Sequence, residues 1–314
     1  MEQQNKPPVL FLMGPTASGK SALAVKLAKA FDGEIISVDS ALVFKGMDIG
    51  TAKPSLAERE GIPHYLIDIL DPSESFSTGQ FKAQALNLMA AISERGKLPI
   101  LVGGTQLYFN ALSGLAVLPE ADASIRAKLD EELAKWGKLA LHQRLAKVDP
   151  EAAARIHPND PQRLQRALEV YEITGIPLSA LFKQAQTQAL AYPIIKLLVA
   201  HTERKVLHGL IAERFRYMLE QGLIAEVEKL YSRGDLNEKM PAIRAVGYRQ
   251  VWSYLQGEDS YENMVEKAIA ATRQLAKRQF TWLRRETQAA NFAAESQTLW
   301  PQIRAYVSKT LAVG

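Results

Sequence analysis

An eight-residue motif near the amino terminus constrains the fold of this chain more than any other feature. Residues 14–21 read GPTASGKS, which matches the pattern G-x-x-x-x-G-K-[ST] at each fixed position. The apolar run Val9–Met13 precedes the motif, and apolar residues at helical spacing follow it over residues 18–30. These patterns predict a buried strand, a phosphate-binding loop and a helix. We therefore expect an α/β fold that contains a P-loop.

The residue types of this loop suit phosphate binding. Glycines let backbone N–H groups converge on phosphate oxygens, and the following helix adds its positive dipole end. We expect Lys20 to neutralise phosphate charge and the Ser21 hydroxyl to ligate Mg²⁺. A glycine-rich turn that binds nothing is the alternative. The predicted phosphate- and substrate-binding residues are Gly14, Pro15, Thr16, Ala17, Ser18, Gly19, Lys20 and Ser21.

Further apolar runs predict additional strands of a parallel sheet. They occupy residues 34–38, 64–70, 98–102 and 194–200. Asp39 follows the first of these runs, and Thr105 follows the third after two glycines. Ligands of open parallel sheets bind outside the carboxyl ends of the strands, so both residues are expected at the site. Asp39 would either hold Mg²⁺ through water or act as a general base, and capping of a helix or turn is the alternative for both residues.

The pattern changes between the third and fourth of these runs. Residues 120–191 show amphipathic helical spacing with breaks near Pro150, Pro161 and Gly175, and no strand signal. Because strand 194–200 returns the chain to the sheet, we expect a helical insertion in an α/β domain. After it, residues 203–233 and 261–285 are expected to form long helices.

The distribution of charge is more informative than its sum. The 38 Lys and Arg exceed the 34 Asp and Glu by only four, which by itself indicates no nucleic acid. Two clusters, at residues 244–249 and 273–285, interleave Arg and Lys with aromatic residues. This combination is used to grip unpaired RNA. A solvated helix face is the alternative for either cluster alone.

The absence of cysteine excludes several chemistries. Among 314 residues there is no Cys, so disulfides, thiolate nucleophiles and Cys-ligated metal sites are ruled out, and a reducing compartment fits. The start of the sequence, MEQQNKPP, does not resemble a signal peptide, and no run approaches the roughly 20 apolar residues of a membrane span. We expect a cytoplasmic monomer without a membrane partner.

A series of segments, in order along the chain, resembles the tRNA dimethylallyltransferase (isopentenyl-tRNA transferase) family of bacteria. They are GPTASGKS (14–21), ISVDSALVFKGMDIGTAKP (36–54), PHYLIDILDP (63–72), LVGGTQLYF (101–109), HPNDPQRLQRALEV (157–170), RAVGYRQVWSYL (244–255) and ATRQLAKRQFTWLRR (271–285). The resemblance implies a P-loop NTPase-like parallel sheet core with a helical insertion domain and additional C-terminal helices. The core would comprise residues 1–119 and 192–314, and the tRNA-binding insertion residues 120–191.

The resemblance also implies an activity. A dimethylallyl group would pass from dimethylallyl diphosphate to N6 of the adenosine at tRNA position 37, immediately 3′ of the anticodon, in tRNAs that read codons beginning with U. The P-loop would hold the diphosphate leaving group, with Mg²⁺ as cofactor. The expected partners are the tRNA anticodon stem-loop and dimethylallyl diphosphate; whether ATP or another nucleotide also binds the P-loop stays open.

The same resemblance assigns roles to residues. Asp39 would accept the proton of the N6 amine of a base flipped into the pocket. Lys20, Ser21 with Mg²⁺, Thr105 and Arg214 would stabilise the leaving diphosphate, although a solvated Arg is the alternative for Arg214. Positions matching tRNA contacts of the family are Asp39, Ser40, Ala41, Leu42, Thr105, Arg126, Gln162, Arg163, Leu164, Gln165, Arg166, Arg244, Ala245, Val246, Gly247, Tyr248, Arg249, Lys277, Arg278, Gln279, Phe280, Thr281, Trp282, Leu283 and Arg284.

Other functions fit the P-loop as well. A small-molecule kinase would use the loop for ATP and Asp39 to activate a hydroxyl. An adenylate isopentenyltransferase would act on free AMP, and a nucleic-acid-binding protein would use the P-loop for regulation. The basic, aromatic C-terminal third argues against the kinase, because a kinase of this kind needs no segments that grip RNA.

Overall fold

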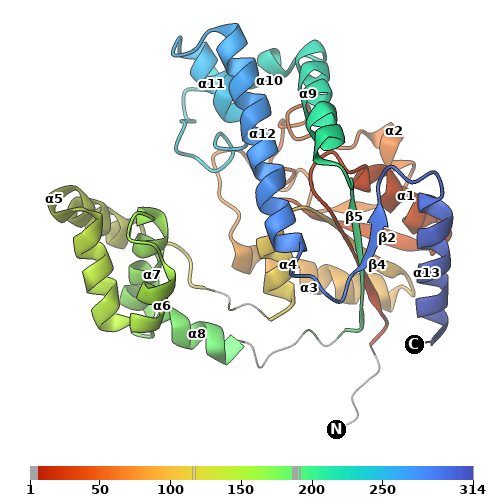
Figure 1. The fold of residues 1–314 in the computed structure, drawn as a ribbon, viewed down its shortest axis with the longest axis horizontal. Coiled ribbons are helices and arrows are strands. Elements are labelled where there is room, and N and C mark those ends of the chain that lie inside the picture. The colour runs from red at the N-terminus through yellow and green to blue at the C-terminus, as the bar shows by residue number, and fades with distance from the viewer. Residues whose placement is uncertain (1–5, 115, 117, 186–189, 191, 314) are drawn as a thin grey trace. The chain divides into compact units, whose positions relative to one another are not determined.

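A six-stranded parallel sheet lies at the centre of the larger part of the chain (Figure 1). The computed structural model describes residues 6–114, 116, 118–185, 190 and 192–313. The strands are β1 (Val9–Met13), β2 (Gly33–Val38), β3 (His64–Tyr65), β4 (Leu98–Gly103), β5 (Ile194–Ala200) and β6 (Ala290–Ala293). Their order across the sheet is β3-β2-β4-β1-β5-β6, and neighbouring strands run parallel. This arrangement confirms the predicted α/β class and the parallel sheet.

The register of the sheet determines where the site forms. Met13, the last residue of β1, is paired with Gly103 of β4 and with Leu198 of β5. Val38, the last residue of β2, is paired with the same Gly103. The segments that follow β1, β2 and β4 therefore leave the sheet side by side at one edge. This edge is where open parallel sheets bind ligands.

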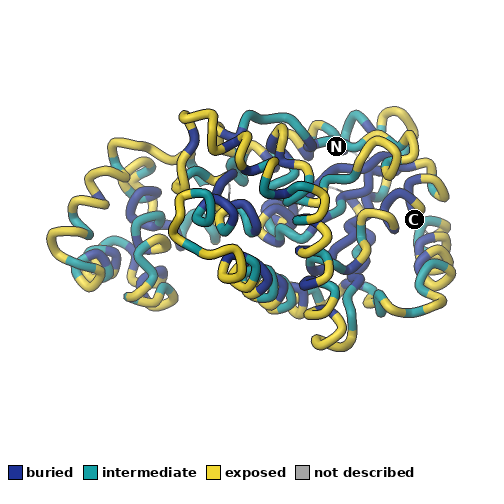
Figure 2. The backbone as a smooth tube through the Cα atoms, turned by 90° about the horizontal axis from the view of Figure 1, so that it is seen from above, coloured by how far each residue is buried: buried dark blue, intermediate teal, exposed yellow. Residues whose placement is uncertain are grey.

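Helices account for most of the remaining chain. They are α1 (Lys20–Ala30), α2 (Leu56–Arg59), α3 (Thr78–Glu94), α4 (Gln106–Leu112), α5 (Ala123–Val148), α6 (Pro150–Arg155), α7 (Pro161–Thr174), α8 (Leu178–Ala185), α9 (Arg204–Glu220), α10 (Leu223–Tyr231), α11 (Tyr248–Leu255), α12 (Tyr261–Leu283) and α13 (Leu299–Val313). Buried and exposed residues alternate along many of the helices (Figure 2), so each such helix turns one side to a core.

The part of the chain that carries the sheet contains at least two apolar cores among its described residues. One core joins apolar residues of β1 to α1 and to Ile303 and Val307 of α13. The other joins α9, α10, α11 and α12 to Val43, Phe44 and Met47, which belong to the long loop after β2. The second core has a functional consequence, because it fixes that loop against the C-terminal helices.

The structure corrects two predicted elements. The strand expected at residues 64–70 ends at Tyr65, because Leu66 and Asp68 have φ values of 60° and 56° and leave the extended conformation. The helix expected at residues 203–233 is divided into α9 and α10 at Gly222, whose φ is 97°. The other predicted strands and the helix at 261–285 are confirmed to within a few residues. Strand β6 and helix α13 were not predicted.

The described residues form two compact units. Unit 1 comprises Met1–Phe76, Gln84–Tyr108 and Ala191–Gly314, and unit 2 comprises Ser77–Ala83 and Phe109–Leu190. The predicted helical insertion, residues 120–191, falls almost wholly in unit 2, which begins at Phe109 and takes in Ser77–Ala83.

Unit 2 contains α5, α6, α7 and α8 around a small core that includes Leu129, Leu145, Leu164 and Leu168. The predicted breaks occur where Asp149 and Asp160 cap the helices α6 and α7 and where Gly175 ends α7. No strand occurs in unit 2 within the residues that the structure describes.

None of the helices in the described part of the chain has both the length and the hydropathy that are needed to span a bilayer. The prediction that the sequence does not start with a signal peptide concerns the first residues. Of these, residues 1–5 lie outside the described residues.

Candidate active site at the carboxyl edge of the sheet

The loop between β1 and α1 has the conformation of an anion-binding loop. A Cβ atom on Gly14 would lie 2.2 Å from the carbonyl oxygen of Val199, so only glycine fits beside β5. Ala17 and Gly19 have φ values of 60° and 75°, the left-handed conformation that occurs in backbone nests for anions. In the described part of the chain, the N–H groups of residues 17–19 donate to no protein acceptor. They are therefore available to a ligand.

Lys20 lies at the start of α1 with its ammonium folded over the loop. Its Nζ donates a hydrogen bond of 2.7 Å to the carbonyl oxygen of Pro15. Burial and the nearby positive charge of Arg214 lower the pKa of Lys20 to about 8, and the charge of Asp39 opposes this shift. The negative charge near this ammonium does not offset its burial and the charge of Arg214. A phosphate ligand would supply further negative charge.

Asp39 and Thr105 meet directly after β2 and β4. Asp39 Oδ1 accepts hydrogen bonds from the amide N–H groups of Ala41, at 2.8 Å, and Leu42, at 3.4 Å. Thr105 Oγ1 accepts one from the amide of Ser40 at 3.2 Å. The turn-capping role that the sequence left open is thus present for Asp39. Asp39 Oδ2, however, accepts no hydrogen bond from the described residues, so one carboxylate oxygen remains free for chemistry.

A cavity of about 530 Å³ brings most of the predicted catalytic and phosphate-binding side chains together within unit 1. Of the predicted site residues, those that line it are Thr16, Lys20, Ser21, Asp39, Ser40, Ala41, Leu42, Thr105, Arg214, Arg244, Ala245, Val246, Gly247, Arg278, Gln279 and Trp282. Residues from the P-loop, from the loops after β2 and β4, from α9 and from α12 therefore line one cavity.

Arg214 is positioned by α9 at this cavity. Burial lowers the pKa of its guanidinium, while the negative charge of Asp39 raises it. Among the described residues Arg214 forms no ion pair with a carboxylate. The alternative of a solvated surface Arg does not fit this half-buried position. Its donors are free to contact an anion that enters the cavity.

The same helix provides an apolar wall that the sequence motifs did not identify. Ile211, Phe215 and Met218 line the cavity and are each less than a tenth exposed. Their spacing of four and three residues places them on one face of α9. Helical periodicity alone indicates a core face here, and only the fold shows that part of this face borders a ligand cavity.

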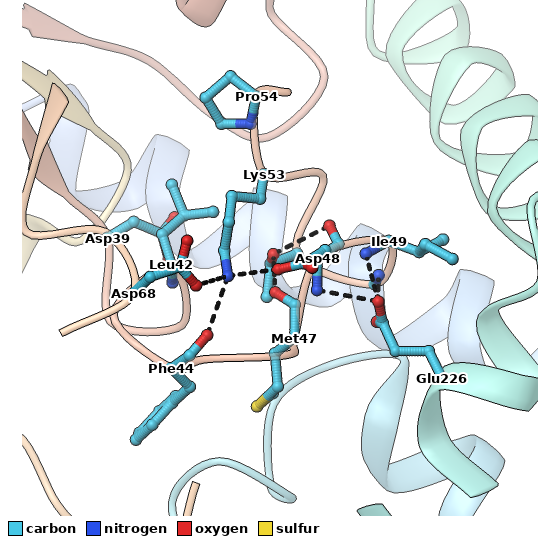
Figure 3. Close-up of polar contacts among 12 residues, drawn as sticks. Asp39, Leu42, Phe44, Met47, Asp48, Ile49, Lys53, Pro54, Asp68 and Glu226 are labelled. Atoms are coloured by element: carbon cyan, nitrogen blue, oxygen red, sulfur yellow. Dashed lines mark hydrogen bonds and ion pairs between the residues drawn. The ribbon is translucent and has the colours of Figure 1, made fainter. Parts of the chain in front are cut away.

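Side chains rather than regular secondary structure hold the loop after β2 in place (Figure 3). The carboxylate of Glu226, on α10, accepts hydrogen bonds from the amides of Asp48, Ile49 and Gly50 at 2.8–3.1 Å. It also accepts one from the Tyr248 hydroxyl at 2.5 Å. Sequence reasoning missed Glu226, because no motif links α10 to a loop 176 or more residues earlier.

Lys53 anchors the same loop from its other side (Figure 3). Its Nζ donates to the carbonyl oxygen of Phe44 at 2.9 Å and forms ion pairs with Asp48, at 2.5 Å, and with Asp68. The Lys53 side chain is only 4% exposed, so these three oxygens replace its hydration. The loop that carries Asp39 and lines the cavity at Gly50 and Thr51 is thus held at two points.

Three of the predicted tRNA contacts have buried side chains. The side chains of Leu164, Tyr248 and Leu283 are 0%, 0% and 5% exposed. Leu164 belongs to the core of unit 2, and Tyr248 packs among α9, α10 and α12. The Tyr248 ring is therefore not accessible for stacking on a base in this structure. Trp282, at 43% exposed, remains available.

The remaining predicted contacts lie outside the cavity lining. In unit 1 these are Arg249, Lys277, Phe280, Thr281 and Arg284; Phe280 is partly buried and the others are exposed. In unit 2 they are Arg126, Gln162, Arg163, Gln165 and Arg166.

The carboxylate of Glu169, which is 1% exposed, pairs with both Arg126, at 2.9 Å, and Arg166, at 2.7 Å. Burial raises the pKa of Glu169, but the hydrogen bonds from the two arginines outweigh burial and lower it.

The residues present fit a Mg²⁺ ion that takes most of its ligands from a substrate. Ser21 supplies a hydroxyl oxygen and Asp39 a carboxylate oxygen to the same cavity. These are hard oxygen donors of the kind that Mg²⁺ prefers, and Mg²⁺ usually keeps waters and phosphate oxygens as further ligands. No group of three or more His, Asp and Glu residues that could hold a metal occurs among the described residues.

Comparisons with known proteins point to one family. A family model described as IPP transferase matches residues 42–286. A protein of Methylococcus capsulatus named tRNA dimethylallyltransferase is 60% identical over 290 residues, which cover 92% of this chain and 93% of that protein. A protein of the same name from Nitrosococcus oceani is 57% identical over 93% of each chain.

Solved structures show the same likeness. A tRNA isopentenylpyrophosphate transferase from Bacillus halodurans superposes with a TM-score of 0.71 at 39% identity, over 98% of this chain and 97% of that one. A eukaryotic dimethylallyltransferase, described as acting on tRNA, superposes with a TM-score of 0.83 at 29% identity, over 98% of this chain and 80% of that one.

Proposed function

Because this chain belongs to the IPP transferase family, we propose that its cavity binds dimethylallyl diphosphate and a flipped adenine of tRNA, and joins the dimethylallyl group to N6 of that base. Full-length relatives at 57–60% identity are named tRNA dimethylallyltransferase, so the chain is an enzyme that transfers a prenyl group to tRNA. The finer assignment is the adenosine at position 37, 3′ of the anticodon, in tRNAs that read codons beginning with U.

One observation carries the proposal. A single cavity is lined by the P-loop lysine, by a carboxylate with one free oxygen, and by an apolar helix face. A prenyl diphosphate needs this combination, because one end carries phosphate charge and the other is a hydrocarbon. The apolar wall at Ile211, Phe215 and Met218 would receive the five-carbon tail.

The reaction exchanges one bond for another. The C1–O bond of the allylic diphosphate breaks, and its electron pair leaves with the diphosphate. The N6 lone pair forms the new N6–C1 bond, and Asp39 Oδ2 accepts the N6 proton. Lys20, Arg214 and the Thr105 hydroxyl stabilise the charge on the departing diphosphate together with the free N–H groups of the P-loop.

The Ser21 hydroxyl would hold Mg²⁺ beside the diphosphate. When bound, this ion supplies positive charge that makes diphosphate a better leaving group. The P-loop serves equally well for this purpose as for a nucleotide, because its N–H groups and lysine recognise phosphate oxygens rather than the group attached to them.

The exposed basic and aromatic side chains of α12 support the RNA part of the proposal. Arg278 and Trp282 line the cavity, and both are exposed. An Arg for phosphate next to an aromatic ring for stacking suits an unpaired RNA segment. Contact of unit 2 with the anticodon stem-loop, a cytoplasmic location and a monomeric state remain predictions.

Incubation with labelled dimethylallyl diphosphate tests the proposal directly. We expect transfer of label to unmodified tRNA and to an anticodon stem-loop with A37, and none to a stem-loop in which A37 is replaced by G. Transfer to free AMP but not to tRNA would indicate an adenylate isopentenyltransferase. Phosphate transfer from ATP without prenyl transfer would indicate a kinase and would overturn the proposal.

Asp39→Asn tests the role of the general base. The amide oxygen can still accept the hydrogen bonds from Ala41 and Leu42, so the turn should persist. We expect kcat to fall by about 10²–10⁴-fold, the contribution typical of a general base, with tRNA affinity unchanged. Asp32→Asn, at an exposed residue before β2, is the matched control. A variant at Asp39 that keeps its kcat would remove Asp39 from the mechanism.

A further inference from the structure

Gln279 links α12 to two loops of the active site through hydrogen bonds. Its Oε1 accepts a bond of 2.9 Å from the amide of Thr16 in the P-loop. Its Nε2 donates a bond of 3.1 Å to the carbonyl oxygen of Gly104, the residue before Thr105. The two partners lie 263 and 175 residues away in the sequence. One side-chain amide therefore joins the P-loop to the loop after β4.

The backbone at Gly104 is shaped to accept this side chain. A Cβ atom there would lie 2.4 Å from Gln279 Nε2 and 3.3 Å from the carbonyl oxygen of Gly14. The first distance is too short for any side chain, so glycine is required for the contact. The absence of a side chain at Gly104 therefore lets Gln279 lie close to this loop.

Gln279 is also distinctive among the residues of its helix. Helix α12 packs against α9 and α11 through residues such as Ala268 and Ala276. In the described part of the chain, no other residue of α12 forms a hydrogen bond with the P-loop. The neighbouring Arg278 and Trp282 line the same cavity. The helix that offers side chains to RNA is therefore tied to the phosphate loop through Gln279.

This tie leaves the phosphate-binding groups free. It uses the amide of Thr16, whereas the N–H groups of residues 17–19 have no protein acceptor among the described residues. The side-chain oxygen and nitrogen of Gln279 are both already engaged within the protein. Gln279 thus has partners within the protein, and the sequence-based expectation that it contacts tRNA stays a separate prediction.

We propose that Gln279 is a positioning residue for prenyl transfer. It holds the P-loop and the Thr105 loop at a fixed spacing, and it aligns both with the RNA-facing side of α12. The proposal rests on the proposed function, because it concerns the alignment of the diphosphate with an adenine presented beside α12. It assigns Gln279 a role in the rate of the reaction rather than in the affinity for RNA.

Gln279→Met tests this role, since methionine keeps the length of the side chain without either hydrogen bond. We expect kcat to fall by roughly 10–100-fold, because misplacement of reacting groups by about an ångström reduces rates by this order. The KM for tRNA should change less than about twofold. Gln274→Met is the matched control, because Gln274 is exposed on the same helix. It should behave as the wild type.

A change in the KM for tRNA without a change in kcat would overturn the proposal. If Gln279 contacts tRNA, Gln279→Met raises the KM for tRNA and leaves kcat unchanged. A variant with wild-type kcat and KM would overturn it as well. Gln279→Glu provides a second variant, because it keeps the acceptor for Thr16 but places an oxygen against the Gly104 carbonyl. We expect a lower kcat with this variant too, at an unchanged melting temperature.

A binding measurement separates this proposal from the proposed function. We expect Gln279→Met to weaken the binding of inorganic diphosphate about tenfold relative to Gln274→Met, because the P-loop and the Thr105 loop lose their common support. If the wild type transfers no prenyl group, the proposed function fails, yet the effect on diphosphate binding still tests the positioning role. Unchanged diphosphate affinity would contradict the role of Gln279 at the P-loop.

Discussion

At the scale of single residues, the site depends on charges that the protein alone does not balance. Burial and the positive charge of Arg214 lower the pKa of Lys20 to about 8, although the negative charge of Asp39 raises it. Burial likewise lowers the pKa of Arg214. Two cations that face one carboxylate leave an excess of positive charge in the cavity. A diphosphate would remove that excess, so the site is prepared for an anionic ligand before it binds.

This electrostatic balance predicts a pH dependence of diphosphate binding. Below pH 7 Lys20 is protonated, and the Kd for inorganic diphosphate should vary only as the ligand itself titrates. Above about pH 8 free Lys20 loses its proton, so binding must take one up, and the Kd should rise by up to about tenfold per pH unit.

Lys20→Arg is the control for this titration, because a guanidinium keeps its charge throughout this range. Isothermal titration calorimetry over pH 6–9.5 measures the difference between the two proteins. Equal slopes for wild type and variant would show that Lys20 does not titrate in this range.

At the scale of elements, the long loop after β2 is the part of the site that regular structure does not support. It carries Asp39 at one end and lines the cavity at Gly50 and Thr51. Three backbone N–H groups of this loop donate to the single carboxylate of Glu226. Lys53 donates a further hydrogen bond to the carbonyl oxygen of Phe44 in the same loop. These contacts replace the ladder of hydrogen bonds that a strand or helix would provide.

Glu226→Gln should loosen this loop. A glutamine offers one acceptor oxygen in place of two and turns an N–H₂ group toward backbone donors, so at least one of the four hydrogen bonds is lost. We expect kcat to fall about tenfold and amide hydrogen exchange at residues 48–50 to accelerate.

Glu228→Gln, exposed on the same helix, is the control for this prediction and should change neither quantity. Faster exchange throughout α10 would instead indicate a general loss of structure.

At the scale of the whole molecule, the arginines that are predicted to contact RNA belong to both compact units. Arg244, Arg278 and Arg284 belong to unit 1, and Arg126, Arg163 and Arg166 belong to unit 2. Arg126 and Arg166 share the buried carboxylate of Glu169, whereas the Arg163 side chain is 72% exposed with only a surface ion pair to Asp160. Arg163 is therefore the better probe of RNA binding, because its replacement disturbs no core.

Arg163→Gln should reduce the salt dependence of tRNA binding. Each phosphate contact that is lost lowers the slope of log K against log salt by about 0.7–0.9. We expect that reduction at an unchanged melting temperature, measured by fluorescence anisotropy between 50 and 200 mM salt, the range over which such contacts respond.

Lys26→Gln, exposed on α1, is the control for this measurement and should keep the wild-type slope. An unchanged slope for Arg163→Gln would place this face of unit 2 outside the RNA interface.

The sequence by itself determined the features that depend on neighbouring residues. The P-loop, the strands at Val9–Met13 and Ile194–Ala200 and the breaks between the helices of unit 2 follow from short motifs, from continuous apolar runs and from the 3.6-residue helical periodicity. The strand expected to continue to residue 70 failed for a local reason that periodicity does not encode, the positive φ values of Leu66 and Asp68.

Only the tertiary structure decided which distant groups meet. It placed Arg214 at the cavity, buried Tyr248, and brought Gln279 into hydrogen bonds with two loops. It also revealed Glu226, whose partners lie 176–178 residues earlier. The physical reason is that such contacts depend on strand order and helix packing. A charged or amide side chain in the sequence does not indicate which distant residue will contact it in the folded protein.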